Sequence, residues 1–143
     1  MPTAKELANI QLVKDFNEAC NSKDSNKISS FYADDYVLEL SGITTPLEQS
    51  RAMDEALFKA FPDFHRVYEL ILAVDDYVIT KFRITMTHQD EFYGIPATNR
   101  KIDWPGIAIY KIADGKFKEG ALFSNRMAML TQLGVTFSLP EPE

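Results

Sequence analysis

The side chains of this chain that are best suited to proton transfer are its two histidines, His65 and His88. Imidazole can change its charge near neutral pH, so either residue could act as a general acid or base. His65 follows Asp63 by two positions, and this carboxylate could orient the ring. Each residue also has a structural interpretation: His88 as a residue that ends a strand, His65 as a surface residue, and Asp63 as a turn residue after a proline. Both interpretations stay open for these three candidate catalytic residues.

Three tyrosines, Tyr32, Tyr36 and Tyr110, could donate hydrogen bonds to a carbonyl or enolate oxygen. A buried tyrosine is also common in a hydrophobic core, where its hydroxyl group reaches a polar partner at the edge. Asp103 stands beside Trp104 and is a further carboxyl group to consider. Because side chains alternate between the two faces of a strand, we expect Asp103 to point away from the face that carries Trp104.

The sequence lacks the residue patterns that are typical of metal and cofactor sites. Two histidines at unmatched positions and one cysteine, Cys20, do not form the ligand clusters typical of metal sites. No two of the six glycines are two positions apart, so the dinucleotide-binding fingerprint is absent. Cys20 belongs to the apolar stripe of a predicted helix and is interpreted as a small core residue. We therefore expect neither a metal nor a cofactor.

The charge of the chain restricts the class of partner. The 143 residues carry a formal net charge of −6, and the pI is about 4.9, whereas a nucleic acid or an anionic membrane requires a basic patch. No apolar run is long enough to span a bilayer, and the first residues lack the apolar core of a signal peptide. A single cysteine fits a reducing compartment. The sequence predicts no nucleic-acid partner, no membrane partner and a cytoplasmic location.

The elements that must position these residues are helices early in the chain and strands in its second half. Thr45, Pro46 and Glu48 have the pattern of a helix start, with a capping threonine and a proline at the first helical position. Asp114-Gly115 is a strong two-residue hairpin signal. This order predicts an α+β domain with a strongly curved, mixed and mostly antiparallel sheet and helices packed in its concave face. The predicted strands cover residues 36–40, 65–74, 77–88, 101–113 and 116–124, one domain covers residues 1–134, and residues 135–143 form a tail.

Several short motifs then point to a family. They are Ala60–Asp63, Thr87-His88, Glu91–Thr98, Gly106–Lys111, Asp114–Lys116 and Gln132–Gly134. Through them, roughly the last two-thirds of the chain resembles the SnoaL-like polyketide cyclase family, part of the nuclear transport factor two-like superfamily. The resemblance implies a cone-shaped α+β fold and a back-to-back homodimer. It also implies ring closure by an intramolecular aldol reaction without metal or cofactor.

The resemblance further implies where an acid-base pair would lie. The family's aspartate position falls on Leu122, and its histidine position falls on Ala108. Two hypotheses stay open because neither residue exchanges a proton. One is a cofactor-independent cyclase or isomerase of a small apolar, carbonyl-bearing, polyketide-like molecule, in which Tyr110 and a histidine or carboxylate at the cavity rim replace the pair. The other is a non-catalytic protein of the same fold that binds a small apolar molecule.

Strand alternation then predicts which residues face the cavity of such a fold. Tyr110 is expected on the same face of its strand as Ala108, which makes it the foremost polar candidate for a catalytic residue. The other candidates are His88, Asp63 and His65. On the opposite face, the apolar residues Ile107, Ile109, Ala121 and Phe123 indicate a partner site and fit a homodimer. The predicted ligand-binding residues are Tyr32, Tyr36, Phe82, Trp104, Ala108 and Leu122.

Overall fold

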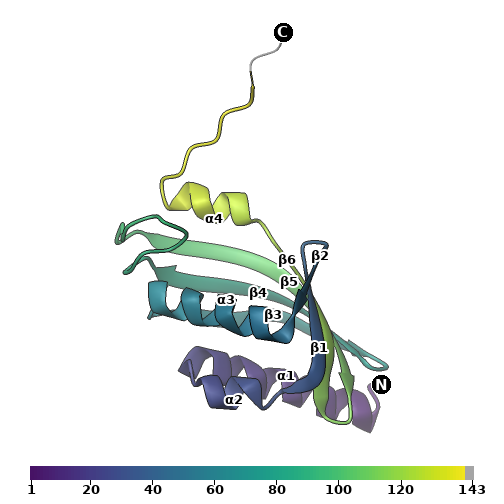
Figure 1. The fold of residues 1–143 in the computed structure, drawn as a ribbon. Helices are drawn as coiled ribbons and strands as arrows, with labels where there is room; N and C mark the ends of the chain where they lie inside the picture. The colour runs from purple at the N-terminus through teal and green to yellow at the C-terminus, as the bar shows by residue number, and fades with distance from the viewer. Residues whose placement is uncertain (141–143) are drawn as a thin grey trace.

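The computed structural model describes residues 1–140 and contains a six-stranded sheet with the strand order β2-β1-β6-β5-β4-β3. Neighbouring strands are antiparallel, except that β1 and β6 run parallel. Helices α1 and α3 lie against one face of the curved sheet, and α2 lies beside α1, as Figure 1 shows. The predicted α+β class with a mixed, mostly antiparallel sheet is confirmed. The elements are α1 (Ala4–Ser22), α2 (Ser25–Ser29), β1 (Tyr32–Leu40), β2 (Ile43–Pro46), α3 (Leu47–Ala60), β3 (His65–Val74), β4 (Tyr77–Thr87), β5 (Lys101–Ala113), β6 (Lys116–Ser124) and α4 (Arg126–Gln132).

The hairpin of β5 and β6 forms the centre of the sheet and has the predicted bounds. Asp114 and Gly115 have φ angles of 53° and 70°, the left-handed conformation that tight hairpin turns require. On the concave face, the ring of Tyr110 stacks on Phe117 at 4.7 Å, and Phe16 of α1 meets Phe117 edge-on at 4.8 Å. This aromatic contact joins the first helix to the central hairpin.

The start of α3 differs from the prediction. Residues Ile43–Pro46 form strand β2 at the edge of the sheet, where Thr45 pairs with Leu38. The helix begins only at Leu47, with Pro46 as an N-cap that makes no side-chain hydrogen bond. The turn after β1 favours continued pairing over helix formation here. Pro46 is compatible with this pairing because an edge strand does not need every N–H group.

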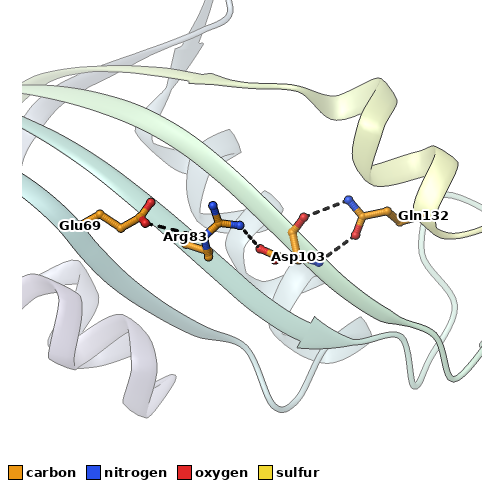
Figure 2. Close-up of polar contacts among 4 residues, drawn as sticks. All are labelled: Glu69, Arg83, Asp103 and Gln132. Atoms are coloured by element: carbon orange, nitrogen blue, oxygen red, sulfur yellow. Dashed lines mark hydrogen bonds and ion pairs between the residues drawn. The ribbon is translucent and has the colours of Figure 1, made fainter.

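The face of the sheet opposite the helices carries a chain of polar contacts (Figure 2). Asp103 lies there, as alternation predicts, and its Oδ1 accepts a 2.7 Å hydrogen bond from Nη1 of Arg83. Nε of Arg83 lies 3.8 Å from Oε2 of Glu69. These contacts tie three neighbouring strands together across the exposed face.

Gln132 completes the edge of β5 where β6 no longer covers it. The pairing of β5 with β6 begins at Gly106, so the backbone of Asp103 lacks a strand partner on that side. The Gln132 side chain supplies both halves of a ladder, because its Oε1 accepts from the Asp103 N–H at 2.8 Å and its Nε2 donates to the Asp103 carbonyl at 2.9 Å. The Gln132 amide therefore joins helix α4 to the backbone of β5, in addition to the buried side chain of Met129.

The residues after α4 extend away from the sheet (Figure 1). Residues 135–140 belong to no helix or strand, and the last three residues of the predicted tail lie outside the described part of the chain. Within residues 1–140, no helix is long and apolar enough to cross a membrane.

Replacing Gln132 by Ala should lower the free energy of unfolding by about 1–2 kcal/mol, because two backbone groups of Asp103 lose their partner. Urea denaturation followed by circular dichroism measures this change. Gln11→Ala is the matched control, since the Gln11 amide bonds only to Asp15 within α1. The control should stay within about 0.5 kcal/mol of the wild type. Equal effects of the two substitutions would contradict the proposed attachment.

Candidate functional site

A cavity of about 130 Å³ lies between α3 and the concave face of the sheet. Aromatic and aliphatic side chains make up most of its wall. Among its lining residues, three are charged: Asp54 of α3, Arg66 of β3 and Arg126 at the start of α4. A concave, mostly apolar site with a few converging polar groups is the usual form of a small-molecule site.

Asp54 belongs to the face of α3 that closes the cavity. Ser50, Met53, Leu57 and Phe58 share this face at helical spacing and line the same space. Burial of the carboxyl group raises the pKa of Asp54 from an ordinary 3.8 to about 6, although the nearby charge of Arg66 partly lowers it. A carboxyl group with this pKa is partly protonated near neutral pH and can both accept and return a proton.

Arg66 is held in place by two asparagines of α1. Strand β3 is the edge of the sheet, and Asn21 bonds to its free backbone by accepting from the Arg66 N–H at 2.8 Å and donating to the Arg66 carbonyl at 2.9 Å. Asn17 donates to the same carbonyl at 2.9 Å and accepts from Nε of the guanidinium at 2.7 Å. Both the backbone and the side chain of Arg66 therefore have a defined position.

The guanidinium of Arg66 lies over three aromatic rings. Its Cζ is 5.5 Å from the ring centres of Phe16 and Tyr68 and 5.7 Å from that of Phe82, within the range of cation–π contacts. The Nη2 atom is buried and has no hydrogen-bond partner in the described part of the chain. A buried donor without a partner is costly, so this atom is a natural contact for a ligand.

Tyr32, Tyr36 and Tyr110 add polar groups to the lining, beside Ser50, Ser124 and Tyr93. Burial raises the pKa of each of the first three hydroxyls above its usual value, with a smaller contribution from the charge of Asp54 at Tyr32 and Tyr36. They therefore stay protonated and available as donors. Gly120 permits the position of Tyr36, because a Cβ at residue 120 would lie 2.2 Å from the Tyr36 hydroxyl.

The other predicted ligand-binding residues also lie at this cavity: Phe82, Trp104, Ala108 and Leu122. Ala108 and Leu122 are direct cross-strand partners in the central hairpin. The Trp104 indole N–H donates to the carbonyl of Asn125 at 3.0 Å and is already satisfied by the protein. The wall of the central hairpin is thus apolar where Ala108 and Leu122 meet, and Tyr110 and Ser124 are polar residues of this wall.

The structure does not bring the other predicted catalytic residues to the cavity. The ring of His88 is buried on the far side of Phe61, where Nδ1 accepts from the Thr98 N–H at 3.2 Å. Asp63 accepts two 2.7 Å hydrogen bonds from Thr87, one from its N–H group and one from its hydroxyl. His65 is exposed at the start of β3. None of the three is among the lining residues, so they take no part in the function proposed below.

Sequence reasoning missed both Asp54 and Arg66, although each left a signal. Asp54 lies between Met53 and Leu57 on the apolar stripe of α3, where a carboxylate is unexpected. Arg66 alternates with Phe64 and Tyr68 on the inward face of its strand. A charged residue at an apolar position of the pattern indicates a site more directly than a histidine at the end of a strand.

Cys20 also lines the cavity, and burial raises its pKa to about 11, which keeps it a thiol. A thiol in this state is a poor nucleophile and a poor metal ligand. Within residues 1–140, no three side chains of His, Cys, Asp or Glu lie close enough together to hold a metal ion.

Comparisons with known proteins agree on one family. The model of the family described as "SnoaL-like polyketide cyclase" matches residues 10–133. No match was found among curated proteins. Among solved structures, the chain is similar to AclR of Streptomyces galilaeus, described as a candidate hydroxylase, with 27% identity, a TM-score of 0.83, and coverage of 87% of this chain and 93% of that chain.

Two further solved structures are similar over nearly their whole length. IdmH of Streptomyces antibioticus, described as a candidate polyketide cyclase, has 27% identity and a TM-score of 0.77, with 87% of this chain and 97% of that chain covered. A candidate SnoaL-like polyketide cyclase of Jannaschia sp. CCS1 has 21% identity and a TM-score of 0.86, with 95% and 98% covered. The third likeness concerns the fold alone.

The raised pKa of Asp54 should make the folded protein less stable as the pH rises. Between pH 3.8 and about 6 the folded state holds this proton more tightly than the unfolded state, so the free energy of unfolding falls through this window. The effect is at most about 3 kcal/mol. Asp54→Asn removes the titration, so its stability relative to the wild type should increase by up to that amount between pH 4 and pH 7.5. Urea denaturation at both pH values measures the difference.

Glu48→Gln, an exposed acid-to-amide change in the first turn of the same helix, is the control for this experiment. Its effect on stability should change less between the two pH values than that of Asp54→Asn, because the Glu48 side chain is exposed. If Asp54→Asn and Glu48→Gln behave alike, Asp54 has no raised pKa.

Proposed function

Because this chain belongs to the SnoaL-like polyketide cyclase family, we propose that it is a cofactor-independent cyclase-like enzyme in which Asp54 transfers the proton. The substrate would be a small, largely apolar molecule with a carbonyl group. The observation that carries this proposal is the carboxyl group of Asp54, whose pKa is raised to about 6 in an apolar cavity that also holds a charged guanidinium. A general base is most effective when its pKa lies near the working pH.

The proposed reaction is an intramolecular aldol addition with two proton transfers. The ionised Asp54 removes a proton from the carbon next to a carbonyl, and the electrons of that C–H bond form an enolate. The enolate carbon attacks a second carbonyl of the same molecule, which forms a C–C bond and an alkoxide. Asp54 then returns its proton to the alkoxide. Atoms and charge balance without a cofactor, and an isomerase would use the same first step.

The tyrosines have a matching role in this scheme. Negative charge develops on the carbonyl oxygen as the enolate forms, and a donor in a site with little water stabilises that charge strongly. Tyr32, Tyr36 and Tyr110 stay protonated and line the same cavity as Asp54. We assign them as donors to the enolate oxygen. Arg66 adds a positive charge that keeps part of the Asp54 population ionised.

A non-catalytic binding protein of the same fold is the second candidate function. It is favoured by the two residues at the family's acid-base positions, Ala108 and Leu122, which form a purely apolar contact between β5 and β6. The two candidates differ in what they require of Asp54. Catalysis needs its ionised form, whereas binding of an apolar molecule would be weakened by it.

The outer face of the sheet supports a proposal on assembly. Several large apolar residues are exposed on it, with Lys81 between Leu70 and Ile107 in the strand register, and exposed apolar residues on a sheet face commonly mark a protein partner. We propose that this face pairs with a second copy of the chain around a two-fold axis. The cytoplasmic location stays a prediction from the cysteine content. The exposed apolar residues are Val67, Leu70, Leu72, Ile107 and Phe123.

The proposed proton transfer can be tested without the natural substrate. Cyclohexanone has one ring, one carbonyl and acidic neighbouring C–H groups, so its exchange of hydrogen for deuterium in D₂O reports on a general base. The wild type should accelerate this exchange over buffer, with a rate that rises through about pH 6 as Asp54 ionises. Asp54→Asn should lower the acceleration by about 100-fold or more, because the base is lost. Proton NMR measures the rate.

Glu48→Gln again serves as the control and should exchange at the wild-type rate. A wild-type rate equal to that of buffer, together with measurable binding of cyclohexanone, would favour the non-catalytic candidate. Exchange that survives Asp54→Asn would show that another residue is the base.

The proposed dimer predicts a specific effect of a charge on the outer face. Phe123→Lys should shift the mass in light scattering from dimer to monomer at micromolar concentration, because a buried charge would oppose association. The monomer should stay folded, since Phe123 is 46% exposed. Thr85→Lys, at an exposed position of β4, is the control for added charge and should leave the mass unchanged. A wild type of monomer mass would contradict the proposal.

A further inference from the structure

The charge of the cavity is opposite to that of the protein as a whole. The chain has a net charge of −6, yet the charged residues that line the cavity are two arginines and one aspartate. The cavity therefore has a net charge of +1 when Asp54 is ionised and +2 when it is protonated. A positive, poorly solvated site in an acidic protein is suited to an anionic ligand.

Arg66 has a free edge for such a ligand. Nε is already paired with Asn17 on one side of the guanidinium. Nη2 is buried with no partner in the described part of the chain, and the rings of Phe16, Tyr68 and Phe82 surround the group. The aromatic faces attract the cation, and the Tyr68 hydroxyl and the Cys20 thiol also lie near the guanidinium, but no acceptor among residues 1–140 bonds to Nη2. A carboxylate provides acceptors in the plane of the guanidinium, and its two oxygens match the fork of an arginine.

Arg66 and Asp54 are not in direct contact with each other. Asp54 feels the charge of Arg66, but the ion pairs within residues 1–140 do not include this pair. If the two side chains were bound to each other, the edge of Arg66 would be occupied. Asp54 therefore leaves Nη2 of Arg66 without an acceptor.

We propose that the substrate of this protein carries a carboxylate group, which binds to the unpaired edge of the Arg66 guanidinium inside the cavity. This inference rests on the proposed function and adds the chemical class of the substrate. The carboxylate would hold the molecule on β3, while its reactive carbonyl faces Asp54 of α3 and the tyrosine hydroxyls. Binding and proton transfer thus use different residues of the same cavity.

The size of the cavity limits the rest of the molecule. An engineered cavity of roughly 150 Å³ lined by apolar side chains holds a benzene molecule. The cavity of this protein, about 130 Å³, is comparable. Tyr93 lines it and is 59% exposed, which marks the mouth. We therefore expect the enclosed part of the substrate to be about one ring in size.

Arg126 supports the entry of an anion at this mouth. Its Nη1 donates a 2.7 Å hydrogen bond to the Tyr93 hydroxyl, and its Cζ lies 5.6 Å from the centre of the same ring. Both residues line the cavity. This second positive charge lies where a carboxylate would pass on its way to Arg66.

The ionisation of Asp54 should oppose the binding of a carboxylate. Five charged or titratable groups interact electrostatically with Asp54: Arg66 from β3, Glu55 from its own helix, Tyr32 and Tyr36 from β1, and Cys20 from α1. Tyr110 from β5 and Arg126 from the start of α4 line the same cavity. The tyrosine hydroxyls and the thiol stay uncharged and the arginines stay charged near neutral pH, so Asp54 is the group inside the cavity whose charge changes there. Carboxylate binding should therefore weaken as the pH rises through 6.

Benzoate and benzamide form a matched pair of probes, since they have nearly the same shape and differ in charge. Isothermal titration calorimetry on the full chain should give benzoate at least about tenfold tighter binding than benzamide at pH 5.5. Between pH 5.5 and pH 7.5 benzoate should bind several-fold more weakly, whereas benzamide should not change. Benzoate itself stays ionised over this range, so a change must come from the protein.

Substitutions of Arg66 and Asp54 test whether these two residues cause the preference for benzoate and its pH dependence. Arg66→Met should remove the preference for benzoate, and Arg66→Lys should reduce it partly, because an ammonium keeps the charge without the fork. Arg83→Met is the matched control, since Arg83 lies on the outer face and contacts Asp103 and Glu69. It should bind both probes like the wild type. Asp54→Asn should remove the pH dependence and keep the preference for benzoate.

Two results would overturn the proposal. One is equal or tighter binding of benzamide by the wild type, or no binding of either probe at millimolar concentration. The other is a preference for benzoate that persists in both Arg66 variants. The wild-type comparison needs no variant, so misfolding of Arg66→Met leaves the test intact. Binding is measured here without turnover, so Asp54-dependent exchange of cyclohexanone with no benzoate preference would reject the carboxylate and keep the proton transfer. The reverse result would reject the proton transfer alone.

Discussion

The contact between two asparagines of α1 and Arg66 fixes the geometry on which the cavity depends. A guanidinium under a helix loses its water, and several kcal/mol of desolvation must be offset by partners. Asn17 and Asn21 provide them, and at the same time they bond to the backbone of an edge strand that would otherwise be unpaired. The same four hydrogen bonds therefore join α1 to β3, protect an edge of the sheet and aim a cation at the cavity.

Gln132 and Asn21 solve the same physical problem in different parts of the sheet. Each is a helical amide that donates to and accepts from the backbone of one residue, Asp103 in the first case and Arg66 in the second. An unpaired strand edge invites pairing with another chain, and a side-chain amide blocks it with the correct number of donors and acceptors. The two arginines on these strands point to opposite faces of the sheet. Arg83 is on the outer face and pairs with the carboxylates of Glu69 and Asp103, whereas Arg66 is on the inner face and pairs with no carboxylate among residues 1–140.

Much of the fold could be predicted from local signals, but the charged part of the site could not. The central hairpin was predicted from Asp114-Gly115 and from the alternation of apolar and polar residues on either side. Both signals depend on only a few neighbouring residues, so they can be recognised in the sequence. The prediction that Thr45 caps a helix was wrong, because Thr45 pairs with β1 in the edge strand β2. This pairing depends on the folded sheet and cannot be recognised from the local capping pattern. Asp54 and Arg66 come from a helix and an edge strand, and their approach depends on how α3 crosses the concave face. His88 was overvalued because residue type alone does not tell whether a ring faces the cavity or the far side of Phe61.

The location of Asp54 relative to Ala108 and Leu122 follows from the shape of the cavity. Ala108 and Leu122 lie on the central hairpin, whereas Asp54 projects from the helix that covers the same space. A ligand inside a cavity of about one ring in size touches both walls, so an acid or base reaches it from either side. Burial alone would raise the pKa of Asp54 further, and the nearby charge of Arg66 lowers it to about 6, where the carboxyl group can exchange a proton near neutral pH.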